Sequence, residues 1–214
     1  AAFDDMVSRS VPFYGEIHRI ILDLTRYYTG KSSTIYDLGC STGTTMALID
    51  KAQKEQGKHV LLIGVDNSEE MLKVCKKKLN RKKVRDFELI CDQIENIKFK
   101  KSDMIIMNYT LQFIPPKVRS DLLSRIHKSL KKGGILILSE KIKSEDNTTG
   151  KLLTDLYYDF KRRNGYSELE IAQKRQALEN ILKPMTTHQQ LELLKKAGFK
   201  NSENIFRWYN FASY

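Results

Sequence analysis

The chain has 214 residues, enough to bury one sizeable hydrophobic core. Hydrophobic residues make up 41% of it and charged residues 29%, and no apolar run approaches the roughly 18 residues of a membrane span, which argues against a disordered or membrane-spanning chain. The net charge of +11 leaves RNA or an acidic partner open, and because residues 1–10 lack the apolar core of a signal peptide, we expect a cytoplasmic protein.

The first predicted element is an N-terminal helix over residues 10–28. Ser10 can cap this helix, and Pro12 fits its first turn, where a missing N–H costs nothing. Phe13, Ile17 and Ile21 then begin an apolar stripe at helical spacing.

From residue 34 onward, short apolar runs alternate with amphipathic segments, the pattern of a parallel sheet with right-handed helical crossovers. The predicted strands cover 34–38, 60–65, 87–91, 104–107 and 135–138, and the predicted helices cover 44–56, 69–79 and 116–130. A helical insertion over 150–183, a helix over 187–197 and an antiparallel hairpin over 206–214 follow. Without repeats or a linker, the sequence predicts one α/β domain over residues 1–214, with a mostly parallel Rossmann-like sheet, an antiparallel C-terminal strand and added helices.

A glycine-containing loop, DLGCSTG at residues 37–43, follows the first predicted strand and opens the next helix. Glycine there lets the backbone turn sharply and approach a ligand closely. Asp66 ends the second strand, where an acidic residue typically bonds the ribose hydroxyls of a nucleotide. A tight turn with a helix cap would explain the loop alone, but the loop and Asp66 together favour a nucleoside site.

The loop departs from the dinucleotide-binding pattern. Ser41 fills the position of the second glycine, no glycine follows at the third, and no lysine makes a P-loop. With an acidic residue before its glycines, the loop resembles the first motif of class I S-adenosylmethionine-dependent methyltransferases. That cofactor carries no phosphates and needs no phosphate cradle, so we expect S-adenosylmethionine on a class I methyltransferase fold.

Polar residues end the neighbouring strands as well. Asn67 follows Asp66, Asp92 and Gln93 follow the third strand, and Asn108 ends the fourth. The carboxyl ends of parallel strands meet at one edge of a sheet, where such folds bind their ligands. Each residue alone is as well explained as a turn or cap, but their convergence on one edge favours a ligand site.

The remaining polar residues give weaker signals. Cys40, Cys75 and Cys91 form no disulfide pattern, the four histidines lack ligand spacing, and we expect no metal. Cys40, within the loop, is most simply a small packing residue. From Lys73 to Arg85 there are eight basic residues and no acidic one. Because charge alone is not specific, we favour a solvated helix face over a surface for RNA or an acidic partner.

One group of motifs is more specific than the general fold. Amino methyltransferases often carry Asn/Asp-Pro-Pro-aromatic after the fourth strand, but this chain has NYTLQF at 108–113. That stretch, together with residues 9–12, 36–41, 138–141 and 159–162, and above all GYSELEIAQKRQALEN at 165–180, resembles the carboxy-S-adenosyl-L-methionine synthase family. The similarity covers nearly the whole chain.

The resemblance implies a definite reaction. The family converts S-adenosylmethionine and prephenate into carboxy-S-adenosylmethionine, phenylpyruvate and water, and so prepares a cofactor for the 5-oxyacetyl modification of wobble uridine in tRNA. The methyl carbon beside the positive sulfur loses a proton and takes up the carbon dioxide that prephenate releases as its ring becomes aromatic. The protein's part is then mainly to position the reactants and to exclude water.

The resemblance also implies site residues. Arg175 matches the arginine that receives the new carboxylate, for which a guanidinium offers a planar fork. By charge pattern alone Arg175 would be an exposed helix residue, and because its helix is an addition to the core fold, a neighbouring subunit could supply it. No general base is predicted, since Tyr14, Tyr109 and Arg119 have no evident reach. The implied cofactor-binding residues are Tyr14, Gly39, Cys40, Ser41, Asp66, Asn67, Asp92, Gln93 (where the family commonly has isoleucine), Asn108 and Arg175.

Two other functions fit the same motifs. One is a conventional methyltransferase acting on a small molecule or RNA, which the basic charge favours, and the other is a non-catalytic S-adenosylmethionine-binding module. The products formed from S-adenosylmethionine and prephenate would separate the three. The carboxy-S-adenosylmethionine synthase hypothesis further implies a homodimer, prephenate as small-molecule substrate and a downstream tRNA carboxymethyltransferase as partner, without a membrane or direct tRNA binding.

Overall fold

The computed structural model describes residues 2–214, and its internal contacts divide them between two compact units. Helix α5 (Pro116–Ser129) and strand β5 (Leu130–Lys141) contribute residues to both. The single domain expected over 1–214 stays a prediction. The first unit comprises residues up to 14, 109–121 and 139–214, and the second comprises 15–108 and 122–138.

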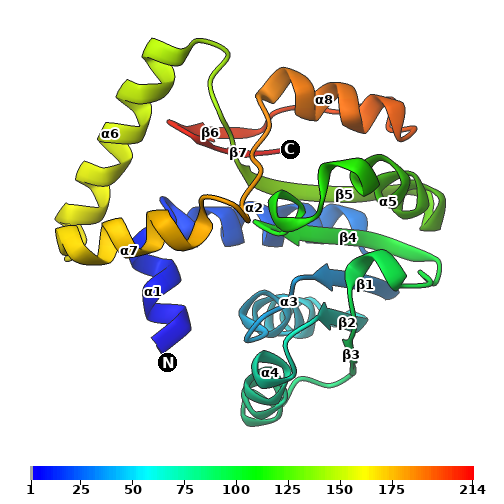
Figure 1. Cartoon of the computed structure of the whole chain (residues 1–214). Helices are drawn as coiled ribbons and strands as arrows, with labels where there is room; N and C mark the ends of the chain where they lie inside the picture. The colour runs from blue at the N-terminus through cyan, green and yellow to red at the C-terminus, as the bar shows by residue number, and fades with distance from the viewer. Residues whose placement is uncertain (1) are drawn as a thin grey trace. The chain divides into compact units, whose positions relative to one another are not determined.

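The second unit holds the parallel part of the sheet, formed by β1 (Ser32–Leu38), β2 (His59–Asp66), β3 (Phe87–Cys91) and β4 (Ser102–Asn108). Strand β1 pairs in parallel with β2 and β4, and β2 pairs with β3. Strand β2 is apolar over residues 60–65 and β4 over residues 104–107, because both faces of these strands are largely buried. Along the chain as a whole, the strand order is β3-β2-β1-β4-β5-β7-β6 (Figure 1).

Helices follow the strands of the second unit as crossovers. Helices α3 and α4 lie side by side and pack against β2 (Figure 1). Ser68 caps α4, because its hydroxyl accepts the N–H of Met71 at 3.3 Å. The helices are α2 (Tyr14–Tyr28), α3 (Thr44–Glu55) and α4 (Glu69–Arg81), and a short 3-10 turn, η1, covers Ile94–Asn96.

The first unit is mainly helical. Strand β7 pairs antiparallel with the end of β5 and with β6, which confirms the predicted terminal hairpin. None of the helices within residues 2–214 is long and apolar enough to cross a membrane. The elements are α1 (Ala2–Ser10), η2 (Leu111–Phe113), α6 (Asn147–Arg163), α7 (Glu168–Leu178), α8 (Thr187–Lys196), β6 (Phe206–Trp208) and β7 (Phe211–Ser213).

Two tyrosines hold α1 in the first unit through hydrogen bonds. Helix α7 lies next to α1 in this unit (Figure 1). The Tyr157 hydroxyl of α6 donates to the carbonyl of Ser10 at 2.9 Å, and the Tyr166 hydroxyl donates to the carbonyl of Met6 at 3.2 Å. Both tyrosine side chains are buried. The short helix α1 is therefore held by tertiary contacts, since nine residues form no stable helix in isolation.

The predicted fold class is confirmed, and α6 with α7 form the predicted helical insertion. Two of the predicted element boundaries are wrong. The helix predicted over 10–28 begins at Tyr14, because Phe13 adopts a left-handed φ of 54° that interrupts the helical path. Ser10 ends α1 instead of capping α2. Strand β5 also begins earlier than predicted, so Gly133 and Gly134 lie within it.

Candidate cofactor site

The loop between β1 and α3 turns through left-handed backbone at alternate residues. The φ angles are 81° at Gly39, 48° at Ser41 and 75° at Gly43. The N–H groups of Gly39 and Cys40 both donate to the carbonyl of Val65, at 2.8 and 3.0 Å. The loop is thereby folded over the end of β2, and the strained φ of Ser41, a residue with a Cβ, is typical of a functional turn.

Asp66 holds this loop in place. One of its carboxylate oxygens accepts the N–H of Ser41 at 2.9 Å, and the other accepts the N–H of Ser68 at 2.9 Å. Each carboxylate oxygen can accept a second hydrogen bond, so Asp66 keeps capacity for two hydroxyl donors. A pair of ribose hydroxyls fits that capacity.

The end of β3 supplies further polar groups beside Asp66. The N–H of Asp92 donates to the carbonyl of Asp66 at 3.2 Å, and the amide of Asn67 donates to that of Gln93 at 3.3 Å. The carboxylate of Asp92 accepts the side-chain amide of Asn96 at 2.9 Å. Asn67, Asp92 and Gln93 are all exposed and so are open to a ligand.

The predicted site residues divide between the two units. The second unit brings eight of them to the carboxyl ends of parallel strands, where Asn108 ends β4 half-buried. Tyr14 and Arg175 belong to the first unit. The eight are Gly39, Cys40, Ser41, Asp66, Asn67, Asp92, Gln93 and Asn108.

Asp37 is a further candidate that sequence reasoning left out of the site. Its carboxylate is 4% exposed, and Oδ2 has no hydrogen-bond partner within residues 2–214. Burial, aided by the neighbouring charge of Asp66, raises the pKa of Asp37 to about 7. The acidic position before the loop glycines is the signal that could have placed Asp37 in the site. A buried, unpaired carboxylate beside the loop suits a ligand with a positive charge.

The thiol of Cys40 is a packing group. A hydrogen bond with Cys75, followed by burial, raises the pKa of Cys40 far above its usual range. Both cysteines are buried and free of disulfides. A protonated thiol is a poor nucleophile, so Cys40 contributes shape and its backbone to the loop, as expected from sequence.

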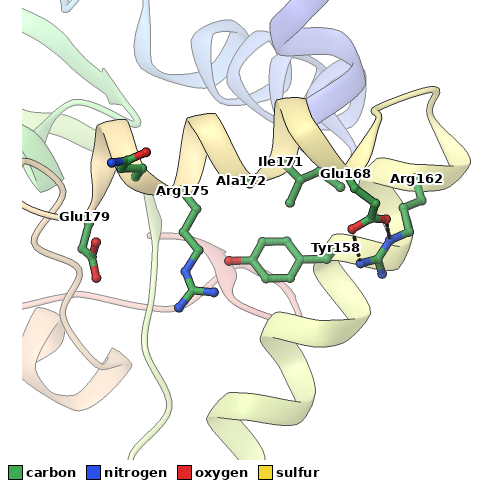
Figure 2. Close-up of a pocket in the computed structure, with 8 residues that line it drawn as sticks. Tyr158, Arg162, Glu168, Ile171, Ala172, Arg175 and Glu179 are labelled. Atoms are coloured by element: carbon green, nitrogen blue, oxygen red, sulfur yellow. Dashed lines mark hydrogen bonds and ion pairs between the residues drawn. The ribbon is translucent and has the colours of Figure 1, made fainter.

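Arg175 lines an exterior pocket of about 370 Å³ in the first unit, between α7 and α6 (Figure 2). Its side chain is exposed and extends beside the ring of Tyr158. Arg162, in the same pocket, is paired with Asp159 at 2.7 Å and with Glu168. Arg175 forms no ion pair within residues 2–214, so its planar fork is open to an incoming carboxylate.

Neither Tyr109 nor Arg119 has the properties of a general base. The Tyr109 hydroxyl is buried, and burial raises the pKa of Tyr109 well above its usual range, so the phenol keeps its proton. Arg119 is 2% exposed and donates to the carbonyls of Ile114, at 2.8 Å, and Gln112, at 3.1 Å. Burial raises the pKa of nearby Glu140 to about 8, against the opposing charge of Arg119, so this group is a buried structural cluster.

The basic run from Lys73 to Arg85 lies on α4 and the turn after it. Several of its charges serve local structure. Lys78 donates to the hydroxyls of Thr42 and Thr44 at 2.8 Å each and so ties α4 to the start of α3. Arg85 donates to the carbonyl of Lys58 at 2.7 Å. These contacts agree with the interpretation of the run as a partly solvated helix face.

The polar groups at the ends of these strands fit a nucleoside. The structure places a glycine turn, a buried unpaired carboxylate at Asp37 and the acceptor-rich ends of β2 and β3 in one unit. Carboxylates there can accept ribose hydroxyls and an adenine amino group, and the loop N–H groups are already used within the protein.

Comparison with known proteins agrees with this fold. A family described as "Methyltransferase domain" matches residues 35–134. The solved structure of YcgJ from Bacillus subtilis superposes with a TM-score of 0.68 at 14% identity, over 91% of this chain and 72% of that one. The cyclopropane synthase MmaA2 of Mycobacterium tuberculosis gives 0.61 at 19% identity, over 87% and 62%. The protein therefore has the class I methyltransferase fold.

Closer relatives define the family. A carboxy-S-adenosyl-L-methionine synthase of Shewanella sediminis is 45% identical over 99% of this chain and 86% of its own length. Proteins of the same name from Nautilia profundicola and Methylococcus capsulatus are 45% and 43% identical, over 100% and 98% of this chain and 89% and 86% of their own lengths. The chain belongs to the carboxy-S-adenosyl-L-methionine synthase family.

Proposed function

We propose that this protein converts S-adenosylmethionine and prephenate into carboxy-S-adenosylmethionine, phenylpyruvate and water. The observation that carries the proposal is the 45% identity with a relative of that name over 99% of the chain. The loop held by Asp66 at the ends of the parallel strands supports it, because that edge is where this kind of fold binds nucleosides.

The proposed cofactor contacts follow from the chemistry of each group. Asp66 accepts ribose hydroxyls, and Asp92 accepts the adenine amino group. Asp37 lies at the loop with an unpaired oxygen and faces the positive part of the ligand. Tyr14, Gly39, Cys40, Ser41, Asn67, Gln93 and Asn108 complete the proposed contacts, and Arg175 pairs with the carboxylate that the reaction creates.

The reaction balances without an added base. When bound, S-adenosylmethionine supplies a methyl group made acidic by the positive sulfur. Prephenate loses its ring carboxyl as carbon dioxide, and the electron pair left behind makes the ring aromatic as the ring hydroxide departs. That hydroxide takes the methyl proton and becomes water, while the methyl carbon bonds to the carbon dioxide. The side chains of this protein hold the reactants close and exclude water.

We also propose the biological setting. The protein acts in the cytoplasm as a homodimer, and its product is consumed by a tRNA carboxymethyltransferase that modifies wobble uridine. Arg175 is exposed and forms no ion pair within residues 2–214, so the arginine can serve its own protomer or its partner.

Incubation of the purified protein with S-adenosylmethionine and prephenate, followed by mass spectrometry, tests the proposal. We expect the cofactor to gain one carboxyl group and phenylpyruvate to appear in equal amount. Demethylated cofactor together with a methylated acceptor would instead indicate a conventional methyltransferase. Bound but unchanged cofactor would indicate a binding module.

A further inference from the structure

Three lysines gather around two buried tyrosine rings in the first unit. The Lys141 ammonium, from β5, lies 4.8 Å from the ring centre of Tyr157, and the Lys161 ammonium, from α6, lies 4.9 Å from the same ring. Lys161 is also 5.5 Å from the ring of Tyr166, over which Lys174 of α7 lies at 5.8 Å. Three elements thus direct positive charge to one place.

The cluster has no counter-ion of its own. No carboxylate within residues 2–214 forms an ion pair with Lys141, Lys161 or Lys174, although Lys161 is only 5% exposed. Burial, and then the charges of Lys141 and Lys174, lower the pKa of Lys161 to about 8. Burying an unpaired ammonium among like charges costs folding free energy, and stability alone gives no reason for it.

A cation above a ring is attracted to its face, and this contact uses none of its N–H donors. Lys174 donates one N–H to the sulfur of Met6, whereas the ammonium groups of Lys141 and Lys161 form no hydrogen bond within residues 2–214. The Tyr157 hydroxyl is occupied by the carbonyl of Ser10, so this ring is fixed and offers its face. Arg9 lies 4.9 Å from the Tyr166 ring but is paired with Asp5 at 2.9 Å, so the uncompensated charge belongs to the three lysines. Such an arrangement suits a small organic anion with more than one carboxylate.

We propose that Lys141, Lys161 and Lys174 bind the two carboxylates of prephenate. The proposal rests on the proposed function, which makes prephenate a substrate, and goes beyond it by assigning the prephenate site. A dianion supplies the charge that the cluster lacks, and the lysine donors on three elements can engage two separate carboxylates. The cluster is a substrate-binding group, distinct from the residues assigned to S-adenosylmethionine and from Arg175.

Lys161→Met tests the assignment, because methionine keeps the apolar stem and removes the charge. We expect KM for prephenate to rise about 10- to 100-fold, the effect of losing one charge-assisted hydrogen bond, while KM for S-adenosylmethionine stays unchanged. Lys161→Arg should recover most of the affinity. Lys151→Met, at an exposed lysine of the same helix, is the matched control and should behave as the wild type.

Thermal unfolding supplies a second readout that does not need turnover. Prephenate should raise the Tm of the wild type and of Lys151→Met but not that of Lys161→Met, and phenylpyruvate, with one carboxylate, should raise it less. Without prephenate, Lys161→Met should unfold at the same or a higher temperature, since a buried unpaired charge is gone. If Lys161→Met fails to fold, Lys141→Met and Lys174→Met carry the same test.

The two proposals fail differently. A wild type that turns over both substrates, with a Lys161→Met variant whose KM for prephenate is unchanged, would overturn the lysine site and leave the proposed function intact. A wild type that makes no carboxylated cofactor, yet is stabilised by prephenate only when Lys161 is present, would support the site and overturn the reaction.

Discussion

Asp37, next to the end of β1, and Asp66, at the end of the neighbouring strand β2, have different environments. Asp66 accepts two backbone N–H groups, whereas Asp37 is 4% exposed and has an oxygen without a partner. Burial therefore raises the pKa of Asp37 to about 7. The carboxylate next to the loop is half ionised near neutral pH until a positive ligand arrives, which favours binding of a sulfonium compound.

Asp37→Asn should change how stability depends on pH. In the wild type, the unfolded chain loses the Asp37 proton near the ordinary pKa of 3.8 and the folded chain near 7, so stability falls as pH rises between these values. We expect the variant to lack that fall and to be more stable than the wild type by roughly 2–4 kcal/mol above pH 7. Urea unfolding at pH 4, 6 and 8 measures the free energy of unfolding of both proteins. A difference between them that stays constant over this range would refute the raised pKa of Asp37.

Arg175→Ala should weaken binding of the carboxylated product about 10- to 100-fold, because the bidentate pair with the new carboxylate is lost. Affinity for S-adenosylmethionine should change little. Calorimetry with both ligands separates the two effects. Arg163→Ala, an exposed arginine at the end of α6, is the control. Equal affinities of the wild type and Arg175→Ala for the product would rule out the role.

At the level of the elements, the β1–α3 loop depends on Gly43. Its φ is 75°, and a Cβ there would lie 2.5 Å from the Sγ of buried Cys75. Gly57, after α3, shares a left-handed φ of 65° but has open space around it. The two glycines therefore separate the cost of backbone strain from the cost of a clash.

Gly57→Ala should lower the free energy of unfolding by about 1–2 kcal/mol, the cost of left-handed backbone for alanine. Gly43→Ala should lower the free energy of unfolding by roughly 1–3 kcal/mol more than Gly57→Ala, because Cys75 must move. It should also weaken S-adenosylmethionine binding. Chemical denaturation and calorimetry give both quantities. Equal destabilisation by the two substitutions would mean that α4 does not pack tightly under the loop.

Much of this architecture is predictable from the sequence. The central strands produce continuous apolar runs because both faces are buried, and the loop and strand-end residues follow from the positions of these strands. Helix α1 could not be predicted from the sequence, because it depends on tertiary contacts with Tyr157 and Tyr166. The lysine cluster could not be predicted from the sequence, because its members lie on β5, α6 and α7 and meet only after folding. Arg175 is identified by family resemblance, since charge pattern alone makes it a surface residue.

At the level of the whole molecule, the proposed homodimer can be tested through Arg175. If the partner supplies Arg175, mixing Arg175→Ala with Asp66→Asn, each impaired on its own, should restore part of the activity, because each mixed dimer contains one intact site. Steady-state assays after subunit exchange, with exchange verified by native mass spectrometry, measure this. Mixed dimers that form but stay inactive would show that each protomer uses its own arginine.

The most direct test of the central claim follows one carbon atom. The purified protein is given S-adenosylmethionine and prephenate whose ring carboxyl carries a heavy carbon isotope. We expect the isotope to appear in a new carboxyl group on the sulfonium compound, with unlabelled phenylpyruvate formed alongside. Heavy carbon dioxide released to solution, with the sulfonium compound unchanged, would contradict it.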